Sequence, residues 1–508
     1  MRILFVYPLV SETFWSFKHA LRVVRRRAAF PPLGALTVAA MLPARWKKNL
    51  VDLNVRALQD EEILGADYVF VSAMIAQKTS ARQVINRCRA LGVKVVGGGP
   101  LFRAYPDDFV DVDHLIFGEA ETIISEFARD LEAGLAKKSY RASTFPSLDA
   151  VPVPQWDLIN IKDYAAMSIQ YSRGCPFNCE FCDVIVMNGR VPRVKRDEQV
   201  IAELESLHSL GWRGSVFIVD DNFIGNKDKV KGLLKSIIEW QKGLRRPFNF
   251  LTEASVNLAE DPELMSLMVQ AGFNKVFLGL ETPVEEGLKE CGKAQNLRRN
   301  LSESVAILHN NGLAVMGGFI IGFDSDPPDV FQRQVNFIQK NGIVTAMIGL
   351  LTAIPGTQLH SRLQSEGRVL FQSSGNNTDG GEALNFVTRM DRASIIEGYR
   401  WVMNSVYSPE MYYNRIHAFL RSYRPMAKTY LENSDLLAFV RSLWYLGIAD
   451  HKSSHYYWKI LKKTISNYHN SFGDVVTMAI YGYHFRKLFW TPKLPLKWEE
   501  WLSGLATS

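Results

Sequence analysis

The feature that most constrains this chain is a regular alternation of short apolar runs with helical patterns. Over residues 1–140 four runs read as buried strands: RILFVYP, ADYVFVSAM, VKVVGGGP and DHLIFGEAE. Amphipathic stretches such as LGALTVAAML and TSARQVINRCRALG lie between them. Alternation of this kind predicts a parallel sheet with helices on both faces. In such sheets, ligands bind at the carboxyl ends of the strands.

A second alternating region lies between residues 166 and 365. It contains six apolar runs joined by helical patterns, namely AMSIQYSRG, GSVFIVDDNF, FNFLTEAS, NKVFLGLETP, VMGGFIIGF and VTAMIGLLTAIPGT. Six βα units are too few for a closed eight-stranded barrel. The Pro-rich stretch 141–165 lacks periodicity and is interpreted as a linker. Residues 366–392 are either a polar linker or a lid, and residues 393–508 have a helical pattern to the end.

Composition places the chain among ordinary soluble proteins. Of its 508 residues, 47% are hydrophobic and 22% charged, and the net charge is +7 (59 Lys and Arg, 52 Asp and Glu). The basic residues are dispersed, so we expect no nucleic-acid partner. Five cysteines form an odd, sparse set that is typical of a reducing compartment. The apolar N-terminus lacks a cleavage site and no run is long enough to span a membrane, so we expect a cytoplasmic protein.

Three of the five cysteines fall within eight residues, at Cys175, Cys179 and Cys182, with the spacing C-x₃-C-x₂-C. Clustered thiolates suit iron–sulfur clusters, zinc or copper(I). Three ligands are one short of the usual four, so either a distant residue completes the set or one position is open. A structural zinc site would require a fourth Cys or His at a recognisable spacing, and none follows. A disulfide pair is the other alternative, and the reducing compartment argues against it.

At these residues the sequence resembles the radical S-adenosylmethionine (SAM) superfamily, whose C-x₃-C-x-aromatic-C loop appears here with Phe181 as the aromatic residue. The resemblance implies a partial (βα)6 barrel over 166–365 and a [4Fe–4S] cluster held by the three cysteines. Its open iron would chelate SAM, with Phe181 near the adenine. The candidate SAM contacts at strand ends are Asp220, Asp221, Asn222, Glu253, Ser255, Glu281 and Gly318. Helix capping is the alternative for Asp221 and Glu253, and close packing is the alternative for Gly318.

Residues 1–140 resemble the Rossmann-like cobalamin-binding domain found ahead of many radical SAM cores. The resemblance implies that four loops line the corrin, with the candidate contacts Tyr7, Ser72, Met74, Gln77, Gly97, Gly98, Gly99, Gly118 and Glu119. For the three glycines a plain tight turn is the alternative. The D-x-H-x-x-G motif that supplies a cobalt ligand elsewhere is absent, and His19 and His114 have no such context. We therefore expect no histidine below cobalt, and the loop 73–77 is the place to look for what lies there.

The resemblance covers nearly the whole chain and is greatest to the hopanoid C-2 methylases, through strings such as FPPLGALTVAAMLP, SIQYSRGCPFNCEFCD and AIYGYHFRK. It implies cobalamin-dependent methylation of an unactivated carbon on a lipid such as a hopanoid. The implied mechanism cleaves SAM to a radical that removes hydrogen from this carbon, which then takes a methyl group from methylcobalamin. The implied partners are a reductant protein of flavodoxin or ferredoxin type and a lipid-like substrate.

Three points stay open on the sequence alone. The basic, aromatic helices of residues 443–490 suit peripheral contact with the inner membrane, but also a globular helical cap with snorkelling Lys and Arg side chains. The absent histidine leaves room for a radical SAM enzyme of another reaction type, such as cyclisation or oxidation. A non-enzymatic, zinc-stabilised binding protein is a further alternative, although six βα units are not expected of a small zinc module.

Overall fold

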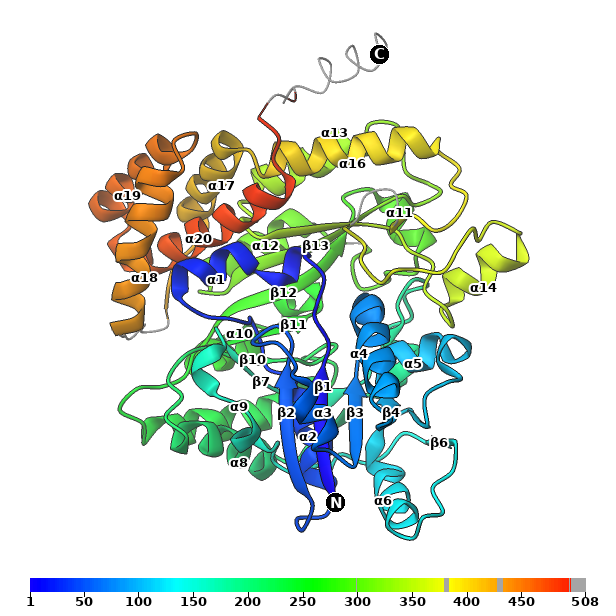
Figure 1. The fold of residues 1–508 in the computed structure, drawn as a ribbon. Coiled ribbons are helices and arrows are strands. Elements are labelled where there is room, and N and C mark those ends of the chain that lie inside the picture. The colour runs from blue at the N-terminus through cyan, green and yellow to red at the C-terminus, as the bar shows by residue number, and fades with distance from the viewer. Residues whose placement is uncertain (298, 379–382, 427–432, 493, 495–508) are drawn as a thin grey trace.

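The computed structural model describes residues 1–508 except 298, 379–382, 427–432, 493 and 495–508 (Figure 1). It contains two six-stranded parallel sheets and a group of C-terminal helices. This α/β architecture with a helical C-terminal region confirms the expected fold class.

The first sheet has the strand order β2-β1-β3-β4-β5-β6. The four expected strands are β1 (Arg2–Tyr7), β3 (Tyr68–Ser72), β4 (Lys94–Gly98) and β5 (His114–Phe117). The structure adds β2 (Lys47–Asp52) and β6 (Ser139–Arg141) as the two edges. Only the last three residues of β2 are buried, which explains why KKNLVD gives little signal in the sequence.

Alternate residues of these strands face two separate cores. Ile3 and Phe5 pack with residues of α2 (Leu33–Met41) and α6 (Ile124–Glu132). Leu4 and Val6 pack on the opposite face with residues of α3 (Asp60–Leu64), α4 (Lys78–Ala90) and α5 (Pro100–Ala104). The sheet is therefore covered on both faces. Helix α1 (Lys18–Val24), the first α-helix after β1, leaves this sheet and packs against the C-terminal helices α18 (Asn433–Trp444) and α20 (Phe472–Phe489).

The second sheet has the order β14-β13-β12-β11-β10-β7, so its strands are neighbours in the order of the chain. They are β7 (Met167–Ile169), β10 (Val216–Ile218), β11 (Phe250–Ala254), β12 (Phe273–Glu281), β13 (Ala314–Ile321) and β14 (Ala346–Leu350). All five pairings are parallel. This is the expected partial barrel of six βα units.

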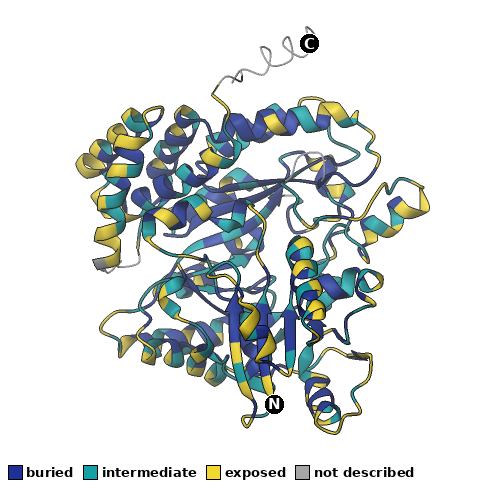
Figure 2. Ribbon diagram, viewed as in Figure 1, coloured by how far each residue is buried: buried dark blue, intermediate teal, exposed yellow. Residues whose placement is uncertain are grey.

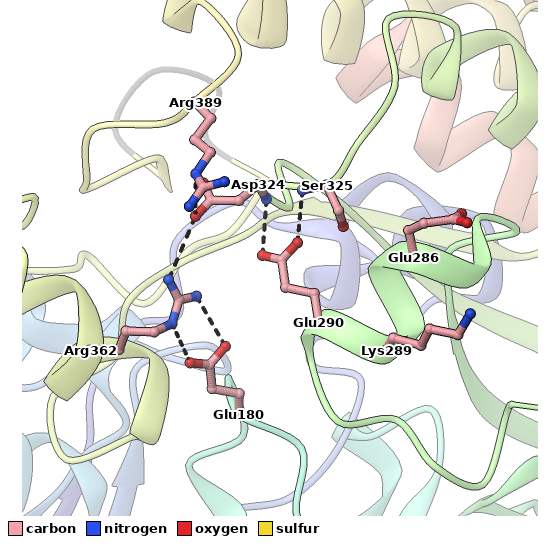
Figure 3. Close-up of a pocket in the computed structure, with 8 residues that line it drawn as sticks. All are labelled: Glu180, Glu286, Lys289, Glu290, Asp324, Ser325, Arg362 and Arg389. Atoms are coloured by element: carbon pink, nitrogen blue, oxygen red, sulfur yellow. Dashed lines mark hydrogen bonds and ion pairs between the residues drawn. The ribbon is translucent and has the colours of Figure 1, made fainter.

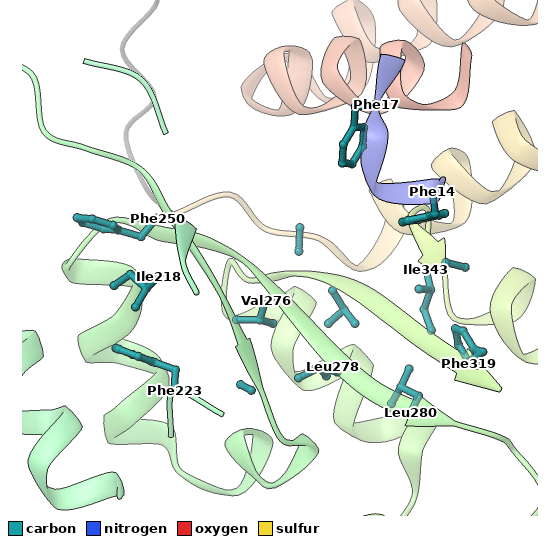
Figure 4. Close-up of a cluster of buried hydrophobic side chains, with 14 of the residues drawn as sticks. Phe14, Phe17, Ile218, Phe223, Phe250, Val276, Leu278, Leu280, Phe319 and Ile343 are labelled. Carbon is teal, nitrogen blue, oxygen red and sulfur yellow. The ribbon is translucent and has the colours of Figure 1, made fainter. Parts of the chain in front are cut away.

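Helices cover the outer face of the partial barrel. They are α8 (Asp197–Ser209), α9 (Lys227–Lys242), α10 (Pro262–Gln270), α12 (Leu301–Asn310) and α13 (Val330–Lys340). The side chains of Val276, Leu278 and Leu280 on β12 belong to the core beneath these helices (Figure 4). Because strand residues alternate in direction, Phe277 and Gly279 belong to the inner face. The register places Met316 beside Phe277 and Met347 beside Gly318 on that inner face.

The C-terminal region is helical, as expected. It comprises α16 (Arg392–Val406), α17 (Pro409–Ser422), α18 (Asn433–Trp444), a π-helical turn at Tyr445–Ala449, α19 (Ser454–Asn467) and α20 (Phe472–Phe489). Figure 2 shows buried residues along α16 and exposed residues along α18 and α19. Within the described part of the chain, no helix has the length and apolar character needed to cross a membrane.

The segment interpreted as a linker, 141–165, and the segment interpreted as a linker or a lid, 366–392, both contact other parts of the molecule. In 141–165, Leu148 and Trp156 are buried, and the Gln199 amide donates to the Leu148 carbonyl at 3.0 Å. In 366–392, the Tyr105 hydroxyl of the first domain donates to the Ser373 carbonyl at 2.9 Å. The expected domain boundaries stay a prediction, and residues 379–382 of the polar stretch lie outside the described residues.

Candidate functional site

The cysteine loop begins after β7 and is fixed by backbone hydrogen bonds at several points. The Cys175 amide donates to the Gly189 carbonyl at 3.2 Å, and the Glu180 amide donates to the Cys291 carbonyl at 2.9 Å. Gly174 has φ +96°, and a Cβ there would lie 2.9 Å from the carbonyl oxygen of Gly189. A side chain at this position would therefore push the loop apart.

The three cysteines of the loop are free thiols, with Cys179 buried and the other two partly buried. Burial raises the pKa of all three, and it raises the pKa of Cys182 to about 12 with help from the Asp183 carboxylate. A thiol this resistant to ionisation becomes a ligand when a metal cation takes the place of its proton.

Two side-chain amides contact the cysteine sulfurs from other loops. The Asn222 Nδ2 group lies 3.9 Å from the Cys175 Sγ atom, and the Gln295 Nε2 group lies 3.8 Å from the Cys179 Sγ atom. Amide donors directed at sulfur ligands stabilise the negative charge of a bound cluster. The donor set of this loop therefore fits an iron–sulfur cluster. No three His, Cys, Asp or Glu side chains among the described residues are grouped to hold one metal ion.

Asp220 and Asp221 follow β10 and hold the start of the cysteine loop. Asp220 accepts from the backbone amides of Tyr171 and Ser172, both at 2.8 Å, and from the Ser172 hydroxyl at 2.6 Å. Asp221 accepts from the Gly174 amide and the Asn188 side chain, both at 2.9 Å. Burial raises the pKa of Asp220 to about 7. Both carboxylates therefore position the loop, and their contact with SAM stays a prediction.

Residues at the end of β11 lie beside this pair. The Ser255 amide donates to the Asn222 Oδ1 atom at 3.2 Å, which joins the ends of β10 and β11. Burial, followed by the charges of Asp221 and Asp220, raises the pKa of Glu253 to about 7. Asn226 and Ser255 occupy the N-cap positions of the helices that follow β10 and β11. The capping alternative for Asp221 and Glu253 is therefore wrong.

Glu281 ends β12 in a left-handed conformation with φ +63°, which is rare for a residue other than glycine. Its carboxylate is paired with the Lys293 ammonium at 2.5 Å. Burial alone would lower the pKa of Lys293, but the charges of Glu281 and Cys179 outweigh burial and raise it. Strain of this kind persists only where the surroundings enforce it and is concentrated at functional sites.

Sequence reasoning missed the segment that follows α11 (Glu285–Glu290). Lys293 binds Glu281, Gln295 contacts the Cys179 sulfur, and the Asn296 amide donates to the Gly279 and Leu280 carbonyls at 3.0 and 3.1 Å. Among the described residues, the buried oxygens of the Gln295 and Asn296 side chains have no hydrogen-bond partner. Polar atoms buried in this way favour a bound polar group. The only sequence signal is a polar run, GKAQN, directly after Cys291.

Gly318 and Phe181 differ in what surrounds them. A Cβ at Gly318 would lie 2.9 Å from the Phe277 ring, so the close-packing alternative accounts for this glycine.

Phe181 is partly buried, and its ring centroid lies 6.4 Å from that of Phe323, in the loop that follows β13. Asp326 fixes this loop by accepting from the Gly322 and Phe323 amides at 2.8 and 3.0 Å.

A charged pocket of about 590 Å³ adjoins the cysteine loop at Glu180 (Figure 3). Arg362 makes two hydrogen bonds to the Glu180 carboxylate, at 2.6 and 3.1 Å. The Glu290 carboxylate accepts from the Asp324 and Ser325 amides at 3.0 and 2.8 Å. Five of the lining side chains, Glu180, Glu290, Asp324, Arg362 and Arg389, are thus paired with one another or with backbone, and they brace the loops on either side.

The expected cobalamin loops follow β1, β3, β4 and β5, and therefore lie at one edge of the first sheet. Gln77 is buried, donates to the Pro8 carbonyl at 2.5 Å and accepts from the Met74 amide at 2.8 Å, which joins two of the loops. The Met74 side chain is 43% exposed. A Cβ at Gly98 would meet only Ile116, at 3.7 Å, which leaves space above the strand end. Tyr7, Ser72, Gly97, Gly99 and Gly118 stand at the same edge.

Neither histidine of the first domain is placed near this edge as a ligand. His114 is the first residue of β5, and its Nδ1 atom lies 2.7 Å from the Lys137 carbonyl. His19 belongs to α1 and pairs with Glu12 at 3.0 Å.

Glu119 forms ion pairs at the junction between the two sheets. Its carboxylate pairs with Arg173 and Arg193 at 2.5 Å each, and Arg173 also pairs with Glu121 at 2.7 Å. Arg173 and Arg193 form the short antiparallel pair of β8 (Ser172–Arg173) and β9 (Arg193–Val194) next to the cysteine loop. The contact of Glu119 with cobalamin stays a prediction.

Three family models match successive parts of the chain. They are the B12 binding domain at residues 21–128, the Radical SAM superfamily at 169–338 and a domain of unknown function, DUF4070, at 357–491. Two solved structures share the fold. The radical SAM methyltransferase TsrM from Kitasatospora setae, with cobalamin and a [4Fe–4S] cluster bound, has a TM-score of 0.61 and 15% identity, covering 92% of this chain and 99% of that one. The cobalamin-dependent radical SAM enzyme OxsB has a TM-score of 0.62 and 14% identity, covering 100% and 80%.

Relatives extend the similarity over almost the full length. An uncharacterized methyltransferase from Synechocystis is 40% identical over 496 residues, which is 96% of this chain and 91% of the relative. The hopanoid C-2 methylase of Rhodopseudomonas palustris is 33% identical over 473 residues, which is 90% of this chain and 88% of the relative.

A cobalamin-binding domain followed by a radical SAM barrel defines the class of cobalamin-dependent radical SAM enzymes. Within that class the chain belongs to the cobalamin-dependent radical SAM methyltransferases, in the branch whose relatives include the hopanoid C-2 methylase. Its cofactors are a [4Fe–4S] cluster, SAM and cobalamin. This membership decides against the two alternatives that the sequence left open, namely a zinc-stabilised binding protein and a radical SAM enzyme of another reaction type.

Proposed function

We propose that this enzyme methylates an unactivated carbon of a lipid, and that the lipid is a hopanoid modified at C-2. The observation that carries the proposal is the extent of the similarity to the hopanoid C-2 methylase, which covers 90% of this chain at 33% identity and so reaches beyond the cofactor-binding domains. A relative that shared only the cofactors would not be expected to match the C-terminal helices.

The inner face of the barrel supports an apolar substrate. The Trp15 indole nitrogen lies 3.0 Å from the Met347 sulfur, and the Trp15 ring centroid lies 5.4 Å from that of Phe277. Met316 neighbours Phe277 in the register between β12 and β13. An apolar wall of this kind suits a fused-ring hydrocarbon and keeps water away from a reactive carbon.

When bound, the cluster, SAM and cobalamin supply the one-electron and methyl-transfer chemistry, and the protein supplies orientation and a dry site. We propose that Cys175, Cys179 and Cys182 hold the cluster. Glu253 and Ser255, at the end of β11, would bind the polar groups of SAM. In this proposal Asp220, Asp221 and Glu281 act mainly by fixing the loops around the site.

We also propose three features of the enzyme's surroundings. A small reductant protein of flavodoxin or ferredoxin type would deliver electrons. The enzyme would work in the cytoplasm, and it would contact the inner membrane peripherally, because a fused-ring lipid resides in a bilayer rather than in water.

Anaerobic assay of the reconstituted enzyme tests the reaction. Full-length protein loaded with iron, sulfide and cobalamin is incubated with SAM, a reductant and detergent-dispersed hopanoid. We expect a lipid product heavier by one methyl group, with the label of methyl-labelled SAM in that group. The Cys182→Ala variant, prepared in the same way, is the control and should form no product. Release of deoxyadenosine without any methylated lipid would contradict the proposal.

A further inference from the structure

One side of α18 exposes a row of large apolar side chains. Leu436, Leu437, Val440, Trp444 and, in the turn that follows, Ile448 are 63, 43, 53, 59 and 50% exposed. Four of them recur every four residues, so they share one face of the helix. These five residues are called the α18 stripe below. A surface helix normally turns such a face towards the core, which makes this exposure informative.

The opposite side of α18 already holds the helix in place. The Arg441 guanidinium donates to the Val23 and Arg22 carbonyls of α1, both at 2.8 Å. The Ser442 hydroxyl lies 2.6 Å from the Tyr457 hydroxyl of α19, and the Phe439 ring centroid lies 5.2 Å from that of Phe472. The α18 stripe is therefore not needed to attach the helix to the protein.

Helix α19 continues the apolar surface and adds positive charge. Its Trp458 indole donates to the Gly447 carbonyl at 3.0 Å, which places the ring beside the turn that carries Ile448. Trp458 and Ile465 are 46 and 62% exposed. Lys459 and Lys462 are exposed between them, and the helix contains three lysines and no acidic residue.

We propose that the α18 stripe and the exposed face of α19 bind the surface of an anionic lipid bilayer. The inference rests on the proposed lipid substrate. Charge complementarity selects this occupant, because the lysines beside the apolar residues match acidic headgroups. Tryptophan prefers the boundary between headgroups and acyl chains, and leucine, valine and isoleucine enter the acyl region beneath it.

The surface is connected to the barrel by one short path. Arg441 ties α18 to α1, and α1 begins directly after the turn Phe14–Ser16. Within that turn, Trp15 contacts Met347 and Phe277 on the inner face. A bilayer bound at α18 would thus be linked through α1 to the apolar wall proposed for the substrate.

Flotation of the full-length protein with lipid vesicles tests the proposal. We expect binding to phosphatidylcholine vesicles that contain phosphatidylglycerol, and much weaker binding to phosphatidylcholine alone. The double variant Val440→Asp/Trp444→Ser should weaken binding at least tenfold, because it places a charge in the acyl region. Replacing Lys459 or Lys462 by Gln should weaken binding to the anionic vesicles about fivefold for each lysine.

Exposed apolar residues elsewhere on the chain provide the matched controls. Leu135 and Val110, in the first domain, are 73 and 67% exposed. Leu135→Ser and Val110→Ser should leave vesicle binding unchanged. Circular dichroism of every variant shows whether it keeps the wild-type fold.

Two outcomes would overturn the assignment of this surface. One is equal vesicle binding by wild type and the double variant. The other is no vesicle binding together with a wild-type dimer that the double variant abolishes in light scattering, which would assign the α18 stripe to a second copy. Methylation of detergent-dispersed hopanoid is measured separately, so failure of the proposed reaction is distinguishable from failure of membrane binding.

Discussion

The two parallel sheets of this enzyme have the same number of strands but use their faces differently. The first sheet has helices on both faces and two separate apolar cores, so only the edge formed by its strand ends is available for a ligand. The second sheet has helices on its outer face, and its inner face carries Glu253, Phe277 and Met347. In both sheets βα alternation sets the strands, while the number of faces covered by helices decides whether a ligand sits on the sheet or at its edge.

Removal of one cluster ligand should show most clearly that the cofactor site of the second sheet is independent of that of the first. We expect Cys179→Ala to lower methyl transfer by more than about 100-fold, because even partners of metal ligands account for about 10- to 100-fold. Iron and sulfide analysis should show loss of the cluster, while the absorbance of bound cobalamin should persist. Simultaneous loss of cobalamin would show that the two cofactor sites are not independent.

Breaking the ion pairs at the junction between the two sheets should have the next largest effect, a loss of unfolding free energy. Arg173→Ala leaves the Glu121 carboxylate without an ion-pair partner among the described residues and leaves Glu119 with Arg193 alone, and both glutamate side chains are only 8% exposed. Breaking a buried pair in this way costs about 3–5 kcal/mol of unfolding free energy, measured by denaturant titration. The exposed pair Arg56–Glu62 provides the control, since Arg56→Ala should cost less than about 1 kcal/mol. Equal losses would contradict a buried junction.

The stability of the folded protein should depend on pH through Glu253 on the inner face of the second sheet, because burial raises the pKa of this carboxyl group from 4.5 to about 7. The folded protein then binds this proton more tightly than the unfolded chain, so the contribution to stability is fully present below pH 4.5 and is lost as pH rises to about 7. Glu253→Gln should remove this loss. We expect the variant, without SAM, to gain up to about 3 kcal/mol relative to wild type between pH 5 and 8. Parallel curves for the two proteins would be the contrary result.

A glycine from each sheet gives the smallest pair of effects. Gly318→Ala should cost about 1–3 kcal/mol, because the added Cβ meets the Phe277 ring at 2.9 Å. Gly98→Ala should leave stability within about 0.5 kcal/mol, because its Cβ meets only Ile116 at 3.7 Å, but it should weaken cobalamin binding. Thermal unfolding measures the stability of the two variants, and cobalamin titration measures the affinity of Gly98→Ala for cobalamin. A stable Gly318→Ala variant would mean that the inner face is less tightly packed than described.

The interior strands were predictable because their signal is local. Runs such as NKVFLGLETP have the length and apolar content of a buried strand, and all of β12 except its first residue, Phe273, lies within that run. The edge strands β2 and β6 were missed because only half of β2 and one residue of β6 are buried. The location of candidate residues at strand ends followed from the rule for parallel sheets.

Partners far apart in the sequence could not be predicted. Asp220 and Asp221 stand at the end of β10 as expected, but their hydrogen bonds to residues 171–174 depend on how two loops meet. Gln295 reaches Cys179 across 116 residues. Glu119 pairs with Arg173 and Arg193 across the junction, a contact that no periodicity within either domain reveals.

The position of α1 has a consequence for biosynthesis. Its buried residues Ala20, Leu21 and Val23 are translated long before α18 and α20, which cover them and begin at residues 433 and 472. At about 5–20 residues per second, the ribosome needs on the order of a minute to reach those partners. During that time the apolar side of α1 is exposed on the nascent chain. The packing of α1 is thus completed only after α18 and α20 have been translated, and a chain truncated before residue 433 would keep the apolar side of α1 exposed.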